Sequence, residues 1–317
     1  MTLTISVIIP AYNRAHKVAG AIDSVLSQSL PVNELIIVDD GSTDNIEAVI
    51  VSMARVATIP IILLRQENRG PSAARNLGIC NAKSNFVMPL DSDDWLMPDA
   101  IRNLTRVMQN DSSVDMVFGS RVTVLPANKK KLTRARALHK DRVKNYEDEL
   151  LSTRPTVGIG AALIKKSFAM LYPFPEEFRI CEDMAFFATA FLKGNCLAID
   201  VPIVEIDQTS HHSFRDAGLL YPEHRMAYEH ALSQSPEGAR KSRLRRMLRA
   251  YPALRSFREL HRAGENQHAT RMYLRAFRID PTQALHISYV RKFLRGLFGF
   301  RHRASQKDRP ISNNKSR

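Results

Sequence analysis

Short apolar runs alternate with amphipathic segments along the first third of the chain. Four runs rich in aliphatic residues have the length of strands, at positions 7–10, 35–38, 61–64 and 87–90. Helical periodicity follows the first of them, because apolar residues recur every three or four positions between 15 and 26. Strands that alternate with helices predict an α/β fold in which the strand ends face one crevice.

The pattern is less regular after residue 120. The segment from Arg121 to Thr156 shows no clear periodicity. Val157–Ile164 is predicted to be a strand whose glycines let another backbone or a substrate approach closely, and Ile203–Ile206 is predicted to be a further strand. Between them, a helix with an inward apolar face is expected to begin at Cys181.

The C-terminal part of the chain is predicted to be helical. Leu244 to Pro281 has the pattern of a helical hairpin that turns at Gly264. A further amphipathic helix is expected over 287–298, with basic residues between its apolar positions, which are Ile287, Val290, Phe293, Leu294, Leu297 and Phe298. The last stretch, 304–317, is polar and is predicted to be disordered.

Acidic side chains gather where two of the predicted strands end. Asp39 and Asp40 follow the second strand, and Asp91, Asp93 and Asp94 follow the fourth. Closely spaced carboxylates at a strand end make a hard oxygen site for a divalent cation, which in turn can hold a diphosphate. The alternative is a polar turn before a helix, since Asp is common in turns and caps.

Composition limits the class of protein. With 317 residues and 44% hydrophobic content, the chain can bury one large core and has material for an appendage. Its three cysteines lack metal-ligand spacing, which favours a reducing compartment. The first strand begins within a few residues of Met1 and no apolar run is long enough to span a membrane, so we expect no signal peptide and a cytoplasmic location.

The net charge of +14 is concentrated in the C-terminal region. Residues 241–317 hold 20 Lys and Arg against four acids, whereas the first 240 residues hold 26 basic and 28 acidic side chains. This asymmetry predicts that the extension addresses an anionic partner. The amphipathic helix at 287–298 suits the headgroup region of an anionic membrane; the alternative is that it packs on the protein's own surface. No nucleic-acid partner is expected, because the region lacks regularly spaced stacking aromatics.

Four segments in this order resemble the family 2 glycosyltransferases: VIIPAYNR (7–14), ELIIVDDGSTD (34–44), ENRGPSAARNLGI (67–79) and VMPLDSDDW (87–95). The resemblance covers Ile5 to Arg215. It implies a GT-A nucleotide-diphospho-sugar transferase fold, which is Rossmann-like, with a mostly parallel sheet flanked by helices and, here, a basic α-helical C-terminal extension. The implied organisation is a catalytic domain at 1–215, a helical extension at 216–303 and a tail at 304–317.

The resemblance also implies where the nucleotide binds. Pro10, Ala11 and Tyr12 match the first strand-end loop of the family, which receives the nucleotide. Asp39 matches the residue that accepts a hydrogen bond from uracil, with Asp40 beside it. A carboxylate suits that role because it only accepts hydrogen bonds when ionised. The alternative for Asp40 is a structural role in the turn that follows.

The matching positions for the diphosphate and a cation follow next. Arg14 and Arg75 are implied to meet diphosphate or nucleotide oxygens, or alternatively to pair with a neighbouring Asp. In the Asp91-Ser92-Asp93 motif, the resemblance gives Asp91 and Ser92 to the ribose or the metal shell and Asp93 directly to Mg²⁺ or Mn²⁺. Asp94 is expected to hold the loop.

An acidic pair at the start of the later helix supplies the catalytic base in this family, and Asp183 matches it. A carboxylate at a helix N-terminus has its ionised form favoured by the helix dipole; the alternative is that Glu182 and Asp183 only satisfy the helix end. A histidine from the SHHSFR segment often reaches the cation, here His211 or His212, with His212 taken as the candidate. The usual Arg-x-His arrangement is missing, which puts this ligand in doubt.

The sequence therefore predicts an inverting glycosyltransferase that moves a sugar from a nucleotide-diphosphate sugar, expected to be a UDP-sugar, to a hydroxyl of a saccharide or lipid-linked acceptor in cell-surface polysaccharide biosynthesis. We expect it at the inner face of the membrane. The alternative is a non-catalytic sugar-nucleotide-binding protein whose basic tail binds membrane or nucleic acid. A nucleotidyltransferase is disfavoured, because no Gly-rich phosphate loop lies near the N-terminus.

Overall fold

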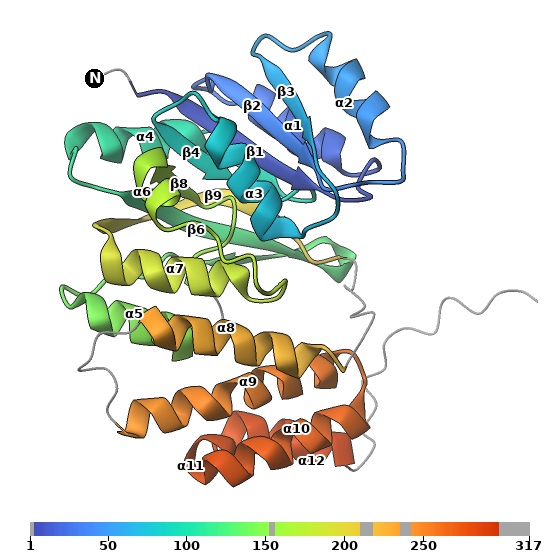
Figure 1. The fold of residues 1–317 in the computed structure, drawn as a ribbon, viewed down its shortest axis with the longest axis vertical. Coiled ribbons are helices and arrows are strands. Elements are labelled where there is room, and N and C mark those ends of the chain that lie inside the picture. Colours follow the sequence, from blue (N-terminus) through green and yellow to red (C-terminus); the bar gives the residue numbers. More distant parts are fainter. Residues whose placement is uncertain (1–2, 152–155, 210–217, 235–241, 298–317) are drawn as a thin grey trace, which may run out of the picture.

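The computed structural model describes residues 3–151, 156–209, 218–234 and 242–297, and it consists of a curved sheet with helices on both faces and further helical layers below (Figure 1). The strands are β1 (Ile5–Ala11), β2 (Glu34–Asp39), β3 (Ile61–Arg65), β4 (Phe86–Pro89), β5 (Trp95–Leu96), β6 (Met116–Leu125), β7 (Lys129–Thr133), β8 (Ala162–Lys165) and β9 (Cys196–Asp207).

The helices that flank the sheet are α1 (Val18–Leu26), α2 (Ile46–Ala54), α3 (Pro71–Asn81), α4 (Ala100–Asn110), α6 (Lys166–Leu171) and α7 (Glu182–Lys193). The lower layers contain α5 (Arg142–Leu151), α8 (Leu220–Gln234), α9 (Ser242–Arg262), α10 (Asn266–Ile279), α11 (Pro281–Ala284) and α12 (Ile287–Leu297). Among the described residues, no helix is both long enough and apolar enough to span a membrane.

The amino-terminal half of the sheet is parallel, as the alternating pattern predicts. Its strand order is β3-β2-β1-β4, and β1 pairs in parallel with both β2 and β4. Alternate side chains of β1 enter two different cores: Val7 and Ile9 pack with α1 and α4, and Ile8 packs with α3. Because these four strands run the same way, their carboxyl ends meet at one edge of the sheet, as the alternating pattern predicts.

The other half of the sheet is mixed rather than parallel. β8 is antiparallel to both β4 and β6, β9 is parallel to β6, and the short β5 is antiparallel to β9. The predicted strand Val157–Ile164 is wrong over most of its length, since β8 begins only at Ala162. Gly160 explains the difference: its φ of +81° is a turn conformation, and a Cβ there would lie 2.9 Å from both Leu90 and Val204.

The segment from Arg121 to Thr156, which lacks a clear sequence pattern, is largely ordered. β6 continues to Leu125, turns through Pro126–Asn128 and pairs with β7, and α5 follows. The order comes from long-range pairing, because β6 runs beside β9 from Met116 to Val124. Local periodicity could not reveal a strand whose partner lies some 80 residues later.

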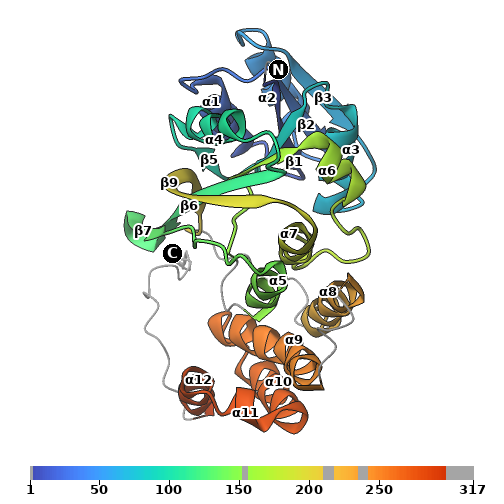
Figure 2. The ribbon, with the colours of Figure 1, turned by 90° about the vertical axis from the view of Figure 1, so that its left-hand side faces the viewer.

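The helices continue as layers away from the sheet, and Figure 2 shows this arrangement from the side. Side chains of α5, α7, α8 and α9 share one core cluster, which includes Tyr146, Met184, Tyr228 and Leu248. The predicted hairpin is confirmed as α9 and α10, with Gly264 at the turn (φ +82°). The expected domain boundary at residue 215 lies outside the described residues.

Candidate active site

The loops after β1 and β2 are tied together by hydrogen bonds. The Asn13 backbone N–H donates to Ser42 Oγ (2.9 Å), and the Thr43 N–H donates to Asn13 Oδ1 (2.8 Å). Pro10 and Ala11 are buried in β1, whereas the side chain of Tyr12 is 45% exposed at its end. Tyr12 is therefore accessible at the end of β1, next to a residue, Asn13, whose hydrogen bonds hold the loop in place.

Asp39 and Asp40 are both buried, and both serve the adjoining loops. Asp39 accepts a hydrogen bond from the Ser42 N–H (2.8 Å). Asp40 accepts three: from the Gln66 side chain (2.7 Å), the Arg69 N–H (2.9 Å) and the Gly70 N–H (2.9 Å). The geometry of Asp40 matches the structural alternative, because its carboxylate fixes the loop that leads into α3. Its contact with a nucleotide stays a prediction.

Asp94 holds the acidic loop against β9, as expected from the sequence. It is buried, its N–H donates to the Asp91 carbonyl (3.1 Å), and its Oδ1 accepts a hydrogen bond from the Asp207 N–H (3.1 Å). Burial raises the pKa of Asp94 well above its ordinary range, and the nearby carboxylates of Asp91 and Asp93 raise it further.

Arg75 joins the acidic loop to the start of α7. Its guanidinium donates to Asp91 Oδ1 (2.8 Å) and to Glu182 Oε1 (2.9 Å), and it lies 5.3 Å from the centre of the Phe174 ring. The side chain is only 3% exposed. Burial alone would lower the pKa of Arg75, but the charges of Asp91 and Glu182 raise it. The Arg75 side chain thus connects Asp91 and Glu182, which are 91 positions apart in the sequence.

Asp93 of the acidic loop contacts Arg14, while Lys17 pairs with the end of β9. Asp93 lies 3.6 Å from Arg14 Nη2, and Ser92 between the two aspartates is buried. Lys17, which the sequence did not single out, pairs with Asp207 (2.7 Å) at the end of β9. Burial opposes ionisation of Asp207, but hydrogen bonds from Lys17 and Thr209 outweigh it and lower the pKa of Asp207 to about 2. His211 and His212 lie outside the described residues.

Asp183 is oriented by its own helix. Its Oδ1 accepts a hydrogen bond from the Met184 N–H (2.7 Å) in the first turn of α7. Glu182 beside it is engaged by Arg75 instead. Burial, together with the charge of Asp183, raises the pKa of Glu182 to about 7 in spite of Arg75. The two members of the acidic pair therefore face different partners.

Two residues near Asp183, Glu149 and Arg255, were not predicted from the sequence. Glu149 of α5 is buried, accepts a hydrogen bond from the Thr156 N–H (2.9 Å), and has its pKa raised to about 7, chiefly by burial. Arg255 of α9 lies 2.8 Å from Met184 Sδ through Nη1, and nearby acidic groups, Asp183 among them, raise its pKa although burial opposes this. Neither residue belongs to a sequence motif. The packing of α5 and α9 in the same core cluster as α7 brings them near Asp183.

The donor atoms at Asp91 and Asp93 suit a hard divalent cation. The described residues contain no group of three or more His, Cys, Asp or Glu side chains able to hold a metal. Two carboxylates on one loop are nevertheless the usual protein share of a Mg²⁺ site, where substrate phosphates and water complete the shell. Of these two carboxylates, Asp91 also accepts a hydrogen bond from Arg75 through its Oδ1 atom (2.8 Å).

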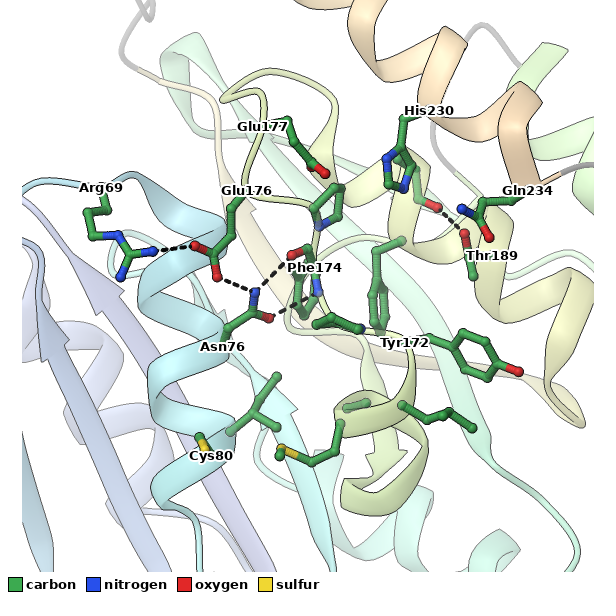
Figure 3. A pocket seen from close by; sticks show the side chains of 18 of the residues that line it. Arg69, Asn76, Cys80, Tyr172, Phe174, Glu176, Glu177, Thr189, His230 and Gln234 are labelled. Carbon is green, nitrogen blue, oxygen red and sulfur yellow. Dashed lines mark hydrogen bonds and ion pairs between the residues drawn. The ribbon is translucent and has the colours of Figure 1, made fainter.

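A groove of about 900 Å³ lies between α3, α6, α7 and α8 (Figure 3). The residues predicted for the donor, cation and base are not among those that line it. Asn76 donates to the Phe174 carbonyl (2.8 Å) and accepts from its N–H (3.0 Å), and Arg69 pairs with Glu176 at one side. Phe174 therefore separates this groove from Arg75, and the groove is distinct from the acidic crevice.

The parallel strand edge, the acidic loop that follows β4 and the helix that begins with two carboxylates agree with the layout expected of a glycosyltransferase of the GT-A type. The sequence matches glycosyl transferase family 2 over residues 6–170, and the chain belongs to this family. This confirms the resemblance inferred from the four motifs.

Several curated proteins are similar to this chain. An uncharacterized glycosyltransferase of Nostoc sp. is 31% identical over 198 residues, which is 60% of each chain. One of Rickettsia conorii is 41% identical over 110 residues, which is 35% of this chain and 18% of that protein. The poly(ribitol-phosphate) beta-glucosyltransferase of Bacillus spizizenii is 26% identical over 209 residues, or 62% of this chain and 31% of that one. The match thus spans less than two thirds of the length of each of these relatives.

Solved structures show the same fold at low sequence identity. S. aureus TarS 1-349 is 17% identical, with a TM-score of 0.58, and the match covers 94% of this chain and 92% of that one. The mannosyltransferase PcManGT from Pyrobaculum calidifontis, in complex with GDP-Man and Mn²⁺, is 17% identical with a TM-score of 0.57, covering 94% and 85%. The expected α/β GT-A fold with a helical extension is confirmed.

Proposed function

We propose that this chain is an inverting glycosyltransferase, which transfers a sugar from a nucleotide-diphosphate sugar to an acceptor hydroxyl in the synthesis of a cell-surface polymer. The observation that carries the proposal is the link through Arg75 between Asp91 of the acidic loop and Glu182 of α7. The link supports the proposal, because it ties the loop expected to meet the donor's diphosphate to the first residue of the helix that carries the expected base, Asp183.

In this proposal Asp183 is the catalytic base. The acceptor hydroxyl gives its proton to the Asp183 carboxylate while its oxygen forms a bond to the anomeric carbon. The bond from that carbon to the diphosphate breaks on the opposite face, and the nucleoside diphosphate leaves with the electron pair. The Met184 N–H fixes the orientation of Asp183, and Arg75 occupies Glu182, so that Asp183 is the acid left to face the substrate.

The leaving diphosphate is proposed to lie against the acidic loop. Asp91 and Asp93 would hold a divalent cation, Mg²⁺ or Mn²⁺, which supplies positive charge for the diphosphate when bound. Arg14, 3.6 Å from Asp93, is free to turn toward the phosphate oxygens because the side chain is partly exposed. The nucleotide would lie on Tyr12, with its base toward Asp39. A UDP donor is supported by TarS, which has been solved with UDP-GlcNAc.

A thermal-shift titration tests the donor and the cation together. We expect UDP-sugars with Mn²⁺ to stabilise the protein, and chelation to remove the effect, because ligand binding adds to the stability of the native state. Asp93→Asn should remove it, whereas Asp99→Asn, an exposed residue outside the loop, should not. Stabilisation by GDP-Man instead of UDP-sugars would overturn the UDP assignment.

Turnover separates the enzyme from a non-catalytic binder. Asp183→Asn should bind donor as the wild type does but lose at least a hundredfold in transfer rate, the usual contribution of a general base. Asp183→Asn that transfers sugar at the wild-type rate would contradict the mechanism. Donor binding without transfer to any saccharide or lipid-linked acceptor would favour the silent sugar-nucleotide binder.

We propose in addition that α12 contacts an anionic membrane. Part of its apolar surface packs internally, because Tyr289 is buried and Phe293 stacks on Tyr273 (ring centroids 4.1 Å). Ile287, Leu294 and Leu297 are exposed beside basic side chains, which is the composition of an interfacial helix.

Flotation of the full chain with phosphatidylglycerol vesicles tests this contact. Leu294→Glu should reduce salt-sensitive binding, whereas Leu171→Glu, at a leucine of α6 that is even more exposed (69% against 43%), should not. Equal flotation of the two variants would count against α12 as the contact surface.

A further inference from the structure

Residues 1–240 are close to neutral overall, but one segment within them is strongly basic. Residues 121–144 contain nine lysines and arginines and one acid, whereas the rest of the first 240 residues contains 17 basic and 27 acidic side chains. The structure arranges this segment as the β6–β7 hairpin and the chain that leads from it into α5. Four of these nine basic residues lie in the two strands, and three of those four, Lys129, Lys130 and Lys131, are consecutive exposed residues of β7.

Alternate residues of β7 face different surroundings. Lys130 pairs with Glu205 of β9 (2.6 Å), and Arg134 just beyond the strand pairs with Asp200 of β9. Lys129 and Lys131 project from the other face of the strand, are exposed, and take part in none of the ion pairs formed among the described residues. Their Cα atoms are two residues apart on an extended strand, about 7 Å. They form a short row of charge that meets no counter-ion among the residues the structure describes.

The hairpin lies next to the acidic crevice. The Gln208 N–H donates to the Val124 carbonyl at the end of β6 (2.9 Å), and the adjoining Asp207 N–H donates to Asp94 (3.1 Å). Asp207 and Gln208, which are adjacent in the sequence, therefore connect the hairpin to the acidic loop through these two hydrogen bonds. Figure 2 shows β7 at the outer edge of the sheet, where it pairs with β6.

We propose that the β6–β7 hairpin binds an acceptor polymer with repeated negative charges, such as a phosphodiester-linked polyol, and presents it to the crevice. The proposal rests on the proposed function, whose acceptor class it specifies. Lys129 and Lys131 contact successive anionic groups, while Lys130 and Arg134 anchor the strand to β9. Two exposed lysines bind weakly and reversibly, which suits a polymer that must move past the site between transfers.

A structural role would also place lysines here, because charge on an edge strand prevents pairing with other chains. Charge reversal distinguishes the two roles. Lys129→Glu with Lys131→Glu keeps the edge charged and protected, but it repels an anionic polymer. The matched control is Lys83→Glu with Lys193→Glu, two exposed lysines that precede β4 and end α7, away from the strand ends that form the crevice.

The experiment measures binding of fluorescent poly(ribitol phosphate) to the full chain by anisotropy, without donor, at increasing NaCl concentration. We expect the wild type to bind this polymer and not dextran of equal length. The Lys129/Lys131 variant should bind about tenfold or more weakly and with a shallower salt dependence, since fewer counterions are released. The control variant should stay within about twofold of the wild type, and both variants should melt as the wild type does.

Unchanged binding in the Lys129/Lys131 variant would overturn the proposal. It would also be overturned if the wild type bound phosphatidylglycerol vesicles but not the polymer, with the vesicle binding lost in the same variant; the hairpin would then be a lipid contact. Because the assay contains no donor and measures no transfer, a protein that binds the polymer but transfers no sugar would contradict the proposed function and leave this inference standing.

Discussion

Replacement of Arg75 by methionine tests the link that holds the candidate active site together. Methionine preserves the length and much of the volume of the arginine side chain while removing its charge. In the variant, Asp91 and Glu182 lose the cation that both of them contact, at 2.8 and 2.9 Å. The Phe174 ring also loses the guanidinium above it.

The expected loss of stability follows from the burial of these groups. Removal of one partner of a buried ion pair costs about 3–5 kcal/mol. The Asp91 side chain is 34% exposed and Glu182 is 12% exposed, so solvent screens part of the loss, and we expect roughly 3 kcal/mol in total. For a chain of 317 residues, an unfolding entropy of about 2.1 cal/mol/K per residue converts this loss into a decrease in melting temperature of roughly 4–5 °C.

The pH dependence gives the sharper test. The pKa of Glu182 is already raised to about 7 in the folded protein, and Arg75 is the main charge that lowers it. Without Arg75 it rises further, so the folded state binds more protons than the unfolded state above pH ~4.5. The destabilisation should therefore be largest above pH 7 and should shrink toward pH 5.

Thermal unfolding of the wild type and of Arg75→Met between pH 5 and 8 measures this effect. Arg225→Met is the control, because Arg225 lies on the surface of α8 and its ion pair with Glu229 is exposed to solvent (3.4 Å); it should change stability little at any pH. Equal stability of Arg75→Met and the wild type, or a loss that does not vary with pH, would refute the role assigned to Arg75.

Three further outcomes follow from buried or strained positions. Asp94→Asn should leave stability nearly unchanged at pH 7, because the amide oxygen still accepts from the Asp207 N–H, whereas Asp94→Ala should destabilise by about 1–3 kcal/mol, measured by urea unfolding. Lys17→Met should destabilise above pH 4, and the difference from the wild type should vanish as pH falls toward 2, where Asp207 becomes protonated; acid titration of fluorescence checks this. Gly160→Ala should lower the melting temperature more than Gly264→Ala, since both have positive φ but only Gly160 has neighbours within 4 Å; similar shifts would remove the steric argument.

The sequence determined the parallel half of the fold and the location of the acidic loop. Its apolar runs are local and strongly periodic, and Asp39, Asp91 and Asp93 stand at strand ends, where connectivity alone brings them to one edge. The helical hairpin at Gly264 was predictable for the same reason, because helices form from contacts close in sequence.

Only the tertiary structure decided the partners of these groups. The pairing of Arg75 with both Asp91 and Glu182, the burial of Glu149, and the approach of Arg255 to Met184 join segments that are far apart in the sequence. The β6–β7 hairpin is ordered by pairing with β9 rather than by its own pattern. Such contacts depend on how helices and strands pack, and no local sequence signal records them, because side-chain burial and charge pairing are properties of the assembled core.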